Sequence, residues 1–537
     1  MPKKRSKSVA RLPVYDLNGR DGVPDAGLAG FKAHNLIRMA AMGLPVPQGF
    51  VMGTDWCSSA ILNGSSITAH LSDALQSGIR DLERASGLGF GSARRPLLVS
   101  VRSGAPVSMP GMMETVLNVG LNDVSLAGLL RLTGDHRLVW DSYRRLIQAF
   151  AEIVAGVPAA PFEAALDVTL QRTGTDLARQ LDFRALRELA GGYLELYRDH
   201  TGQDFPQDPY EQLAAATRAV FASWMSDKAV EYRRLNALSD ELGTAVTVQR
   251  MVFGNAGGNS GAGVGFTRDP SSGENRPYID WLQQAQGEDI VSGRRRVAAE
   301  NEVPGWLMHK LGEVGEALEK SFRDAQEYEF TVENGELFML QTRTAKRTAL
   351  ASLQITVDQV DSGLITPAEA LGRLSGIDVD GITVRRVQSD KPPLGQAIPA
   401  GTGVAQGPAA FSVKAAQAFA AQGTPAILVR NDVATSDIAG IAVVCGVLTA
   451  SGGRTSHAAV VARQMGKVCL VGCADLRIDE GAGKATLGQT VIAEGDSLCL
   501  DGDAGRIYAD SPQITSKRPE ALIARVAEWQ ADALAKQ

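Results

Sequence analysis

Cysteine is scarce in this sequence, and the five that occur are spaced neither as a disulfide framework nor as a zinc site. No uninterrupted run of about 18 apolar residues occurs, so we expect no membrane-spanning helix. The first residues lack the apolar core of a secretory signal, and the basic run Lys3, Lys4, Arg5 is expected to be a frayed tail. Together these absences predict a cytoplasmic protein whose thiols, such as Cys469 and Cys473, are buried.

A strongly basic character is also missing, because the formal net charge is −6 over 537 residues. We therefore expect neither nucleic acid nor an anionic membrane as a partner. Hydrophobic residues make up 44% of the chain and charged residues 21%, which is typical of a globular protein. A chain of this length is too long for one hydrophobic core, so several domains are predicted.

Changes in composition and periodicity predict four successive parts. Residues 1–347 mix helix and strand and include a strongly helical stretch at about 124–240. Residues 348–400 contain a helix and a stretch rich in Gly, Pro and charge, which is typical of a linker. Residues 401–511 alternate strand-like runs with helices, as in a small α/β domain, and residues 512–537 form an amphipathic helix.

Three local patterns predict individual elements. The apolar residues of 210–235 lie near one face of a helix. Thr366 and Glu369 form a capping box around a proline, which marks a helix start. The apolar run 441–449 predicts a strand, one of several in the small α/β domain.

The most informative segment is residues 451–463, SGGRTSHAAVVAR. An apolar strand precedes it, the two glycines form a turn, and a helix of small residues follows, so His457 falls in the first helical turn. Unpaired backbone N–H groups there attract anions, and a neutral imidazole is a competent nucleophile near neutral pH. The alternative is a histidine that only caps or packs the helix, but the glycine pair and the small residues favour a phosphoryl carrier.

This segment resembles the phosphohistidine signature of the pyruvate phosphate dikinase and phosphoenolpyruvate synthase family. The resemblance implies that His457 carries the phosphoryl group on a domain that swivels between two active sites. Arg454 resembles the synthase branch, whereas Ser456 and the run 458–463 resemble the dikinase branch. Thr455 occupies the place of a regulatory phosphorylation site in some dikinases, which makes it a candidate regulatory residue here.

No Walker A pattern occurs, so a P-loop is not expected. The N-terminal part instead resembles the ATP-grasp-like domain of the same dikinases over nearly its full length. The resemblance implies an α/β (α+β) fold, in which an ATP-grasp-like nucleotide-binding domain with a helical insertion precedes a small swivelling α/β phosphohistidine domain. The matching segments are residues 30–36, 100–105, 108–115, 205–209, 251–255, 261–268 and 285–289.

The same resemblance assigns contacts with the phosphates of ATP to Lys32, Arg102 and Arg145, with Arg144 as the alternative to Arg145. We expect Arg102 also to assist catalysis, because a guanidinium can neutralise developing charge with two hydrogen bonds. The glycines of 261–265 are expected to let the backbone approach phosphate, unless this segment is a plain surface turn. Asp280, also predicted to contact the nucleotide, stands where the family usually has Glu.

A β-hairpin is predicted around Asn334 and Gly335. A two-residue turn would make Gln341 face away from Glu329 and would place Glu329 opposite Leu340. A three-residue loop would pair Phe330 with Leu340 instead. We predict the three-residue loop, because it gives the hairpin one apolar face and one largely polar face.

In that register Glu327, Glu329, Gln341 and Arg343 share the polar face. Carboxylates beside an amide oxygen suit Mg²⁺ that bridges phosphates, so Glu329 and Gln341 are the predicted metal ligands. The family uses the matching positions for nucleotide and metal, which adds Glu327 and Arg343 to the predicted nucleotide site. The alternative is a solvated strand face with an ordinary ion pair.

The resemblance implies that His457 attacks ATP with help from Mg²⁺ and the basic residues. AMP rather than ADP is the expected product, and the second phosphoryl acceptor is either inorganic phosphate, as in dikinases, or water, as in synthases. Family members that interconvert pyruvate and phosphoenolpyruvate carry a C-terminal barrel, and this sequence stops about where that barrel would begin. We therefore expect the final acceptor to be bound on a separate subunit.

The sequence leaves the acceptor open. It is either pyruvate, bound by a barrel on a partner chain, or a phenolic compound, as in aryl phosphotransferases resembling phenylphosphate synthase or the hydroxyphenyl-ketone kinases. A hypothesis from another class is a regulatory protein that keeps the fold as a non-enzymatic binding module. The joint presence of Lys32, Arg102, Glu329, Gln341 and His457 favours an enzyme.

Overall fold

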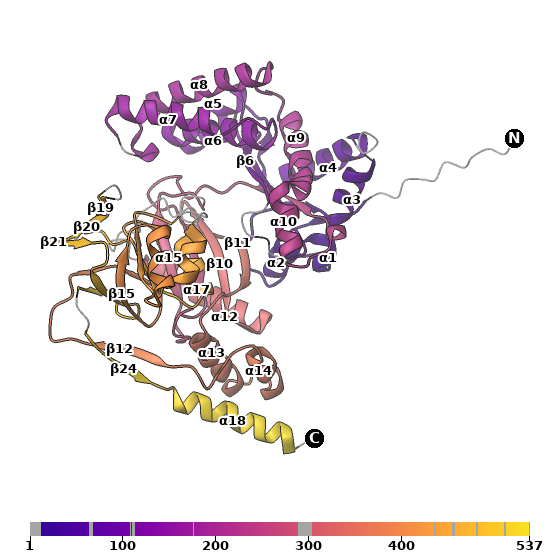
Figure 1. The fold of residues 1–537 in the computed structure, drawn as a ribbon. Helices are drawn as coiled ribbons and strands as arrows, with labels where there is room; N and C mark the ends of the chain where they lie inside the picture. The colour runs from indigo at the N-terminus through magenta and orange to yellow at the C-terminus, as the bar shows by residue number, and fades with distance from the viewer. Residues whose placement is uncertain are drawn as a thin grey trace. The chain divides into compact units, whose positions relative to one another are not determined.

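The protein has a mixed α/β architecture, which confirms the predicted fold class (Figure 1). It divides into two compact units, residues 1–259 with 332–341 and residues 260–331 with 342–537. The computed structural model describes residues 12–63, 68–107, 109, 113–175, 177–287, 303–433, 437–453, 457–479, 482–509 and 512–535.

The first unit contains a sheet of antiparallel strands in the order β1-β2-β7-β5-β6. Two short strands, β3 and β4, form a separate parallel pair. The strands are β1 Val14–Asp16, β2 Gly49–Met52, β3 Gly89–Phe90, β4 Pro96–Leu97, β5 Val99–Gly104, β6 Thr115–Val119 and β7 Ala245–Arg250.

The helices of this unit all bury apolar residues, and those within residues 54–235 share one large hydrophobic core with strands of the sheet. They are α1 Ala26–Ala29, α2 Phe31–Ala41, α3 Thr54–Asn63, α4 Thr68–Ser86, α5 Asp123–Thr133, α6 His136–Ile153, α7 Ala160–Thr173, α8 Phe183–Thr201, α9 Pro209–Ala222 and α10 Asp227–Leu235. The apolar side predicted for 210–235 is buried. The helix is interrupted there, because a 3-10 turn at Ser223–Met225 and an extended Ser226 separate α9 from α10.

The second unit contains a four-stranded sheet in the order β11-β10-β8-β9. The outer part of its hairpin, Val332–Gln341, belongs to the first unit. The elements are β8 Gly261–Phe266, β9 Tyr278–Gln283, α12 Gly305–Phe322, β10 Gln326–Glu333 and β11 Glu336–Thr344.

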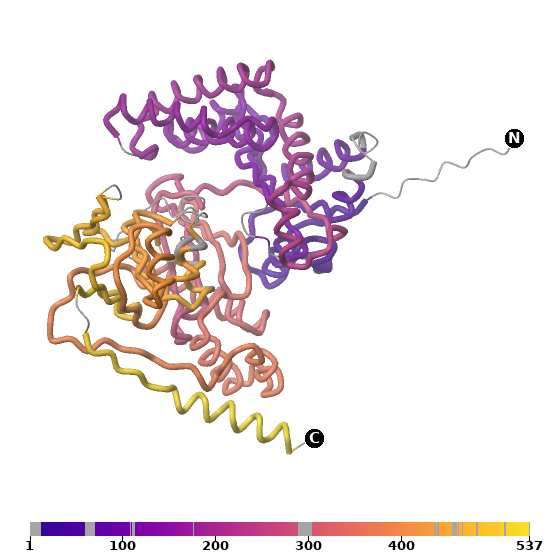
Figure 2. Tube along the Cα trace, in the orientation of Figure 1, coloured from indigo at the N-terminus to yellow at the C-terminus, as the bar shows by residue number. Residues whose placement is uncertain are grey.

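A small helical cluster and a two-stranded ribbon follow the hairpin. The capping box predicted at Thr366 and Glu369 is present, and the proline lies in the first turn. Figure 2 shows the C-terminal helix α18 continuing from strand β24, and its Val526 and Trp529 are buried with Leu353 and Leu374 of the cluster. The elements are α13 Ala349–Asp361, α14 Pro367–Leu374, β12 Val384–Gln388, β24 Gln513–Lys517 and α18 Glu520–Ala535.

The last sheet has the order β13-β23-β22-β15-β16-β17-β18-β14, and its strands β15 to β18 are parallel neighbours. Helices α15, α16 and α17 connect these parallel strands, as crossovers must. The elements are β13 Gly395–Gln396, β14 Ile398–Gly401, β15 Val404–Ala410, α15 Val413–Ala421, β16 Ile427–Arg430, α16 Ile438–Val443, β17 Gly446–Thr449, α17 His457–Gln464, β18 Val468–Val471, β22 Ser497–Asp501 and β23 Arg506–Tyr508. The remaining sheet contains β19 Leu476–Asp479, β20 Lys484–Leu487 and β21 Thr490–Ala493.

The strand predicted over 441–449 is wrong in its first half, because Ile438–Val443 is helix α16 and the strand begins at Gly446. Ile441 is buried in either conformation, so an apolar run alone could not separate the two. The prediction for Cys469 and Cys473 is confirmed, since both are buried free thiols, and burial raises the pKa of Cys469 to about 12. Within the described part of the chain, we find no helix that combines the length and apolarity required to cross a membrane.

Candidate functional site

Lys32 and Arg102 are brought together in the first unit by a close approach of helix α2 to strand β5. Gly30, at φ +76°, lies so near the carbonyl of Gly104 that a Cβ on Gly30 would be 1.9 Å from that oxygen. Only glycine fits there, and it allows Phe31 N to donate to the carbonyl of Ala105 at 2.9 Å. The Cβ of Lys32 consequently lies 3.7 Å from the Cβ position of Gly104, on the strand face that also carries Arg102.

Arg102 also reaches the hairpin part that belongs to the first unit. Its Nη1 donates to the carbonyl of Leu340 at 3.5 Å, and Gln341 is the next residue along that strand. The strand is held by a hydrogen bond from Met339 N to the carbonyl of Pro45 at 2.7 Å. Within this unit the structure thus places Lys32, Arg102 and the backbone before Gln341 near one another.

Arg144 and Arg145 differ in exposure although both bind Asp141. Arg144 is buried and donates to one oxygen of Asp141 at 2.6 Å, while Arg145 donates to the other oxygen at 3.0 Å and keeps 24% of its side chain exposed. Burial alone would raise the pKa of Asp141, but the two arginines more than offset this and hold it well below its usual range. Arg145 is therefore the better candidate of the two for contact with a ligand.

Strand β8, Gly261–Phe266, is buried throughout, so the prediction that its glycines approach phosphate is wrong. Aromatic rings occupy the space that their missing side chains leave: a Cβ on Gly263 would lie 2.2 Å from Cζ of Phe330. Phe330 in turn stacks on Trp281, with centroids 5.8 Å apart and planes at 2°. The pairs of this aromatic face are Gly261 with Trp281, Gly263 with Phe330 and Gly265 with Tyr328.

The opposite side of the same sheet carries acidic residues. Glu327 and Glu329 alternate along β10 with the rings of the aromatic face, so they point the other way. Asp280 is paired in register with Val264, which alternates with the glycines of β8, and it therefore points to the same side. We call Asp280, Glu327 and Glu329 the carboxylate face.

The hairpin turn consists of Asn334 and Gly335 alone, so the predicted three-residue loop is wrong. Both residues have positive φ, 51° and 84°, which is the type I′ geometry that matches the twist of the strands. Asn tolerates that conformation well enough that no third residue is needed to absorb it.

Arg343 nevertheless joins the carboxylate face, because the buried side of β11 changes along the strand. Leu337 and Met339 are buried near the turn, whereas Thr342 is the buried residue further on, which indicates a β-bulge between them. Beyond the bulge Arg343 forms an ion pair with Glu327. Burial lowers the pKa of Arg343, but the hydrogen bond to Glu327 and the charge of Glu329 more than offset this and raise it.

The carboxylate face fits a metal ion that is shared with a nucleotide. Mg²⁺ is usually held by one or two carboxylates together with phosphate oxygens and water, not by a cage of protein ligands. In the ranges described here, no three His, Cys, Asp or Glu side chains come together as a preformed metal site. The carboxylate oxygens of Glu329 suit such a shared ion in chemical type, whereas Glu327 is held by its ion pair with Arg343.

Helix α17 begins at His457, so the predicted position of this residue in the first helical turn is confirmed. The chain enters the helix after a buried glycine turn, in which Gly452 has φ +96°. The His457 side chain and residues 454–456, which include the candidate regulatory Thr455, lie outside the described structure.

One residue of the same helix contacts the side of the sheet that carries the carboxylate face. Arg463, near its C-terminal end, is only 4% exposed, and its guanidinium lies 5.6 Å from the ring centroid of Phe266. Phe266 shares the sheet side of Asp280, because it alternates with the glycines of β8. The sequence alone indicates no role for Arg463, because nothing near it in the chain shows what its side chain contacts.

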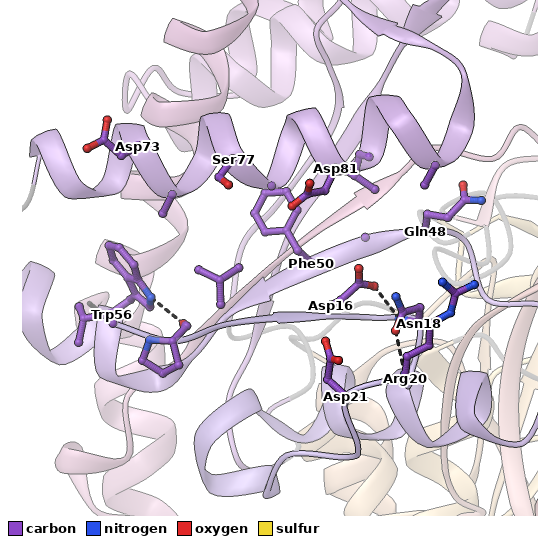
Figure 3. A pocket seen from close by; sticks show the side chains of 18 of the residues that line it. Asp16, Asn18, Arg20, Asp21, Gln48, Phe50, Trp56, Asp73, Ser77 and Asp81 are labelled. Atoms are coloured by element: carbon purple, nitrogen blue, oxygen red, sulfur yellow. Dashed lines mark hydrogen bonds between the residues drawn. The ribbon is translucent and has the colours of Figure 1, made fainter. Parts of the chain in front are cut away.

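A large cavity of about 1370 Å³ lies elsewhere in the first unit, between β1, β2 and helix α4 (Figure 3). Its walls include the acidic residues Asp16, Asp21, Asp73 and Asp81 around the ring of Phe50. Burial, followed by the charges of Asp21 and Asp81, raises the pKa of Asp16. No predicted nucleotide-site residue is among the described residues that line it, so its size does not make it the nucleotide site.

Two family models match this chain. Residues 59–301 match the AMP/ATP-binding domain of pyruvate phosphate dikinase, and residues 423–505 match the mobile domain of PEP-utilising enzymes.

Curated relatives are similar over most of the chain. Pyruvate, phosphate dikinase of Clostridium symbiosum is 42% identical over 512 residues, which cover 94% of this chain and 58% of the relative. The Entamoeba histolytica enzyme is 40% identical over 518 residues, with the same coverage, and chloroplastic pyruvate, phosphate dikinase 1 of Zea mays is 41% identical over 488 residues, covering 89% and 51%. The chain therefore spans a little over half the length of these relatives. With both domains matched in this order, the chain belongs to the pyruvate phosphate dikinase family.

Proposed function

We propose that this chain is the ATP-using part of a dikinase-type phosphotransferase in which His457 carries the phosphoryl group. The observation that carries the proposal is the packing of helix α17 on the carboxylate face through Arg463 and Phe266. His457 begins this helix, so the proposed nucleophile belongs to an element that contacts the sheet face carrying the acids proposed to bind the magnesium nucleotide. The matched nucleotide and mobile domains support the same reading.

The proposed roles follow the charge of each group. Lys32, Arg102 and Arg145 bind the phosphates, and Arg102 also stabilises charge that develops during transfer. Their positive charges suit a polyphosphate, which no single arginine would neutralise.

The acidic residues are proposed to act on the nucleotide and its metal. Glu329 and Gln341 supply oxygen ligands, while Asp280, Glu327 and Arg343 contact the nucleotide and orient those ligands. Bound with ATP, Mg²⁺ would neutralise phosphate charge and so favour attack at phosphorus.

In the proposed first step a nitrogen of His457 attacks the β-phosphorus of ATP. The bond from that phosphorus to the oxygen bridging it to the α-phosphorus breaks, and AMP leaves with that oxygen. The pyrophosphoryl group then remains on the imidazole, and its terminal phosphoryl passes to inorganic phosphate or to water. The neutral imidazole needs no base to become nucleophilic, and the helix N-terminus favours the resulting anion.

We further propose that the phosphoryl group leaves His457 for an acceptor bound outside the two matched domains. Pyruvate is the acceptor named by the relatives, and a phenolic compound is the alternative. Binding of the acceptor on a separate subunit, a swivelling linker over 348–400, regulation at Thr455 and a cytoplasmic location remain predictions. A screen of acceptors with phosphorylated protein, alone and with candidate partner chains, distinguishes the two acceptors.

The test of the enzyme is incubation with Mg²⁺ and ATP labelled at the β-phosphorus. We expect an acid-labile, base-stable label on the wild-type chain, and no label on His457→Ala or when Mg²⁺ is chelated. Wild-type protein that binds ATP but never acquires label would contradict the proposal and favour a regulatory binding module.

A further inference from the structure

The side chain of Arg463 is buried, and its contacts lie outside its own helix. A buried guanidinium loses its hydration, which is costly unless hydrogen bonds and opposite charges replace it. Its Nε donates to the carbonyl of Ala400 on strand β14 at 3.3 Å, a neutral partner within the phosphohistidine region.

Other compensation comes from the sheet that carries the carboxylate face. The ring of Phe266 lies beneath the guanidinium, in the arrangement of a cation–π contact. The charges that act on Arg463 from that side are those of Glu327, Asp280 and Asp269, and Cys469 is the titratable group that faces it from strand β18. Burial nonetheless lowers the pKa of Arg463, although an arginine stays charged at any working pH.

We infer that Arg463 is a positioning residue that docks helix α17, and with it His457, on the carboxylate face for the first phosphoryl transfer. This inference rests on the proposed function. A guanidinium suits a reversible contact, because water can hydrate it once the helix moves away, whereas a fixed apolar contact would leave a bare patch. Phe266 is its partner on the nucleotide-binding side.

The same geometry explains why docking and charge are coupled. Asp280 on β9 and Glu327 on β10 lie on one sheet face, with β8 and its Phe266 between them. Arg463 brings positive charge to them when α17 docks, in addition to that of Arg343 on Glu327. Helix α17 is thus held where the acids are, not merely against an apolar surface.

The experiment compares Arg463→Met, Arg463→Lys and Phe266→Leu with wild type and with Arg477→Met. The last variant removes an exposed arginine of the same region and serves as the matched control. Two donors phosphorylate His457 in parallel: Mg²⁺ with ATP, and phosphoramidate. Phosphoramidate needs no nucleotide site, since its phosphorus–nitrogen bond breaks, ammonia leaves and the new bond forms to the imidazole.

We expect Arg463→Met to slow phosphorylation by ATP about 30-fold or more, because a small misplacement of a nucleophile costs this much. The rate with phosphoramidate should stay within about twofold of wild type, as expected when the histidine itself is undisturbed. Arg463→Lys should recover part of the loss, since it keeps the charge but not the planar fork. Phe266→Leu should slow the ATP reaction several-fold from the other side of the contact, and Arg477→Met should change neither rate.

Equal loss with both donors would overturn the inference and make Arg463 a support for the fold of α17. Unchanged rates in both Arg463→Met and Phe266→Leu would overturn it as well. Should wild type react with phosphoramidate but never with ATP, the proposed function fails, and hydrogen exchange then decides docking separately. In that measurement the amides of β8 and β9 should exchange faster in Arg463→Met than in Arg477→Met, and equal exchange would contradict docking. If Arg463→Met does not fold, Phe266→Leu and Arg463→Lys decide by the same criteria.

Discussion

The two faces of the four-stranded sheet are built from the same strands and use them differently. On the aromatic face, three glycines make room for three rings, and the surface is buried and apolar. On the carboxylate face, Glu327 and Glu329 lie near Arg343, Asp280 lies on the far edge strand β9, and helix α17 contacts the same side through Arg463 and Phe266. One face therefore supports the sheet, while the other holds charge that a simple core would avoid.

A function can be assigned to a glycine-rich strand only with evidence different from that needed for an acidic strand. A Gly-X-Gly-X-Gly pattern fits a phosphate loop and equally fits a strand packed under rings, and the sequence alone does not separate them. Alternating acids on a hairpin leave fewer choices, because a charged residue is rarely buried without a partner or a function.

The largest expected effect is on activity, at the carboxylate face. Glu329→Gln should slow AMP formation by roughly 100- to 1000-fold, because it removes a charge that is proposed to hold the metal nucleotide. The midpoint of urea unfolding should stay near wild type. A slow enzyme that has also lost stability would assign Glu329 to the support of the sheet, as on the aromatic face.

The next effect distinguishes a role in stability, expected for Arg144, from a role in ATP binding, expected for Arg145. Arg144→Met should lower the free energy of unfolding by about 3 kcal/mol or more, because it leaves the buried Asp141 with only the partly exposed Arg145 as an ion-pair partner. Arg145→Met should cost less stability and weaken ATP binding, which calorimetry measures. The reverse order of the two effects would transfer the proposed phosphate contact to Arg144.

On the aromatic face the expected effect is on stability alone. Gly263→Val should lower the free energy of unfolding by about 1–3 kcal/mol, because its side chain would meet the ring of Phe330. The matched control is Gly312→Ala on helix α12, where an added Cβ would meet nothing within 4 Å. This substitution should stabilise the protein slightly, because alanine favours the helix more than glycine does. Nucleotide affinity of the folded Gly263→Val protein should match wild type, and a selective loss of ATP binding would restore the phosphate role of these glycines.

The smallest effect concerns an acid outside the sheet. The pKa of Asp16 is raised in the folded protein, so its contribution to stability is present below the unfolded pKa and is lost as pH rises through the folded value. Asp16→Asn should therefore stabilise the protein near neutral pH, by less than about 1 kcal/mol because the group is half-exposed, and change little near pH 3. Urea titrations at the two pH values measure this, and equal shifts at both would contradict it.

Local signals in the sequence were enough to predict several features. The glycine turn before His457, the capping box at Thr366 and the apolar side of 210–235 each depend on neighbours within a few residues. The family resemblance was likewise visible in short segments spread over both matched domains.

Features set by distant contacts were missed or predicted wrongly. Whether the β8 glycines are buried depends on aromatic rings from β9 and β10. Which side of β11 is buried depends on a bulge that no local pattern marks. The role of Arg463 depends on Phe266, almost 200 residues earlier in the chain. Long-range packing decides such cases, which is why propensity and period did not.

The most direct test of the account is the nucleotide product of a single turnover, with enzyme in excess over ATP. The account predicts one AMP for each His457 that becomes phosphorylated, with no ADP formed, and neither product in His457→Ala. Formation of ADP in place of AMP, or of AMP at the wild-type rate in His457→Ala, would contradict it.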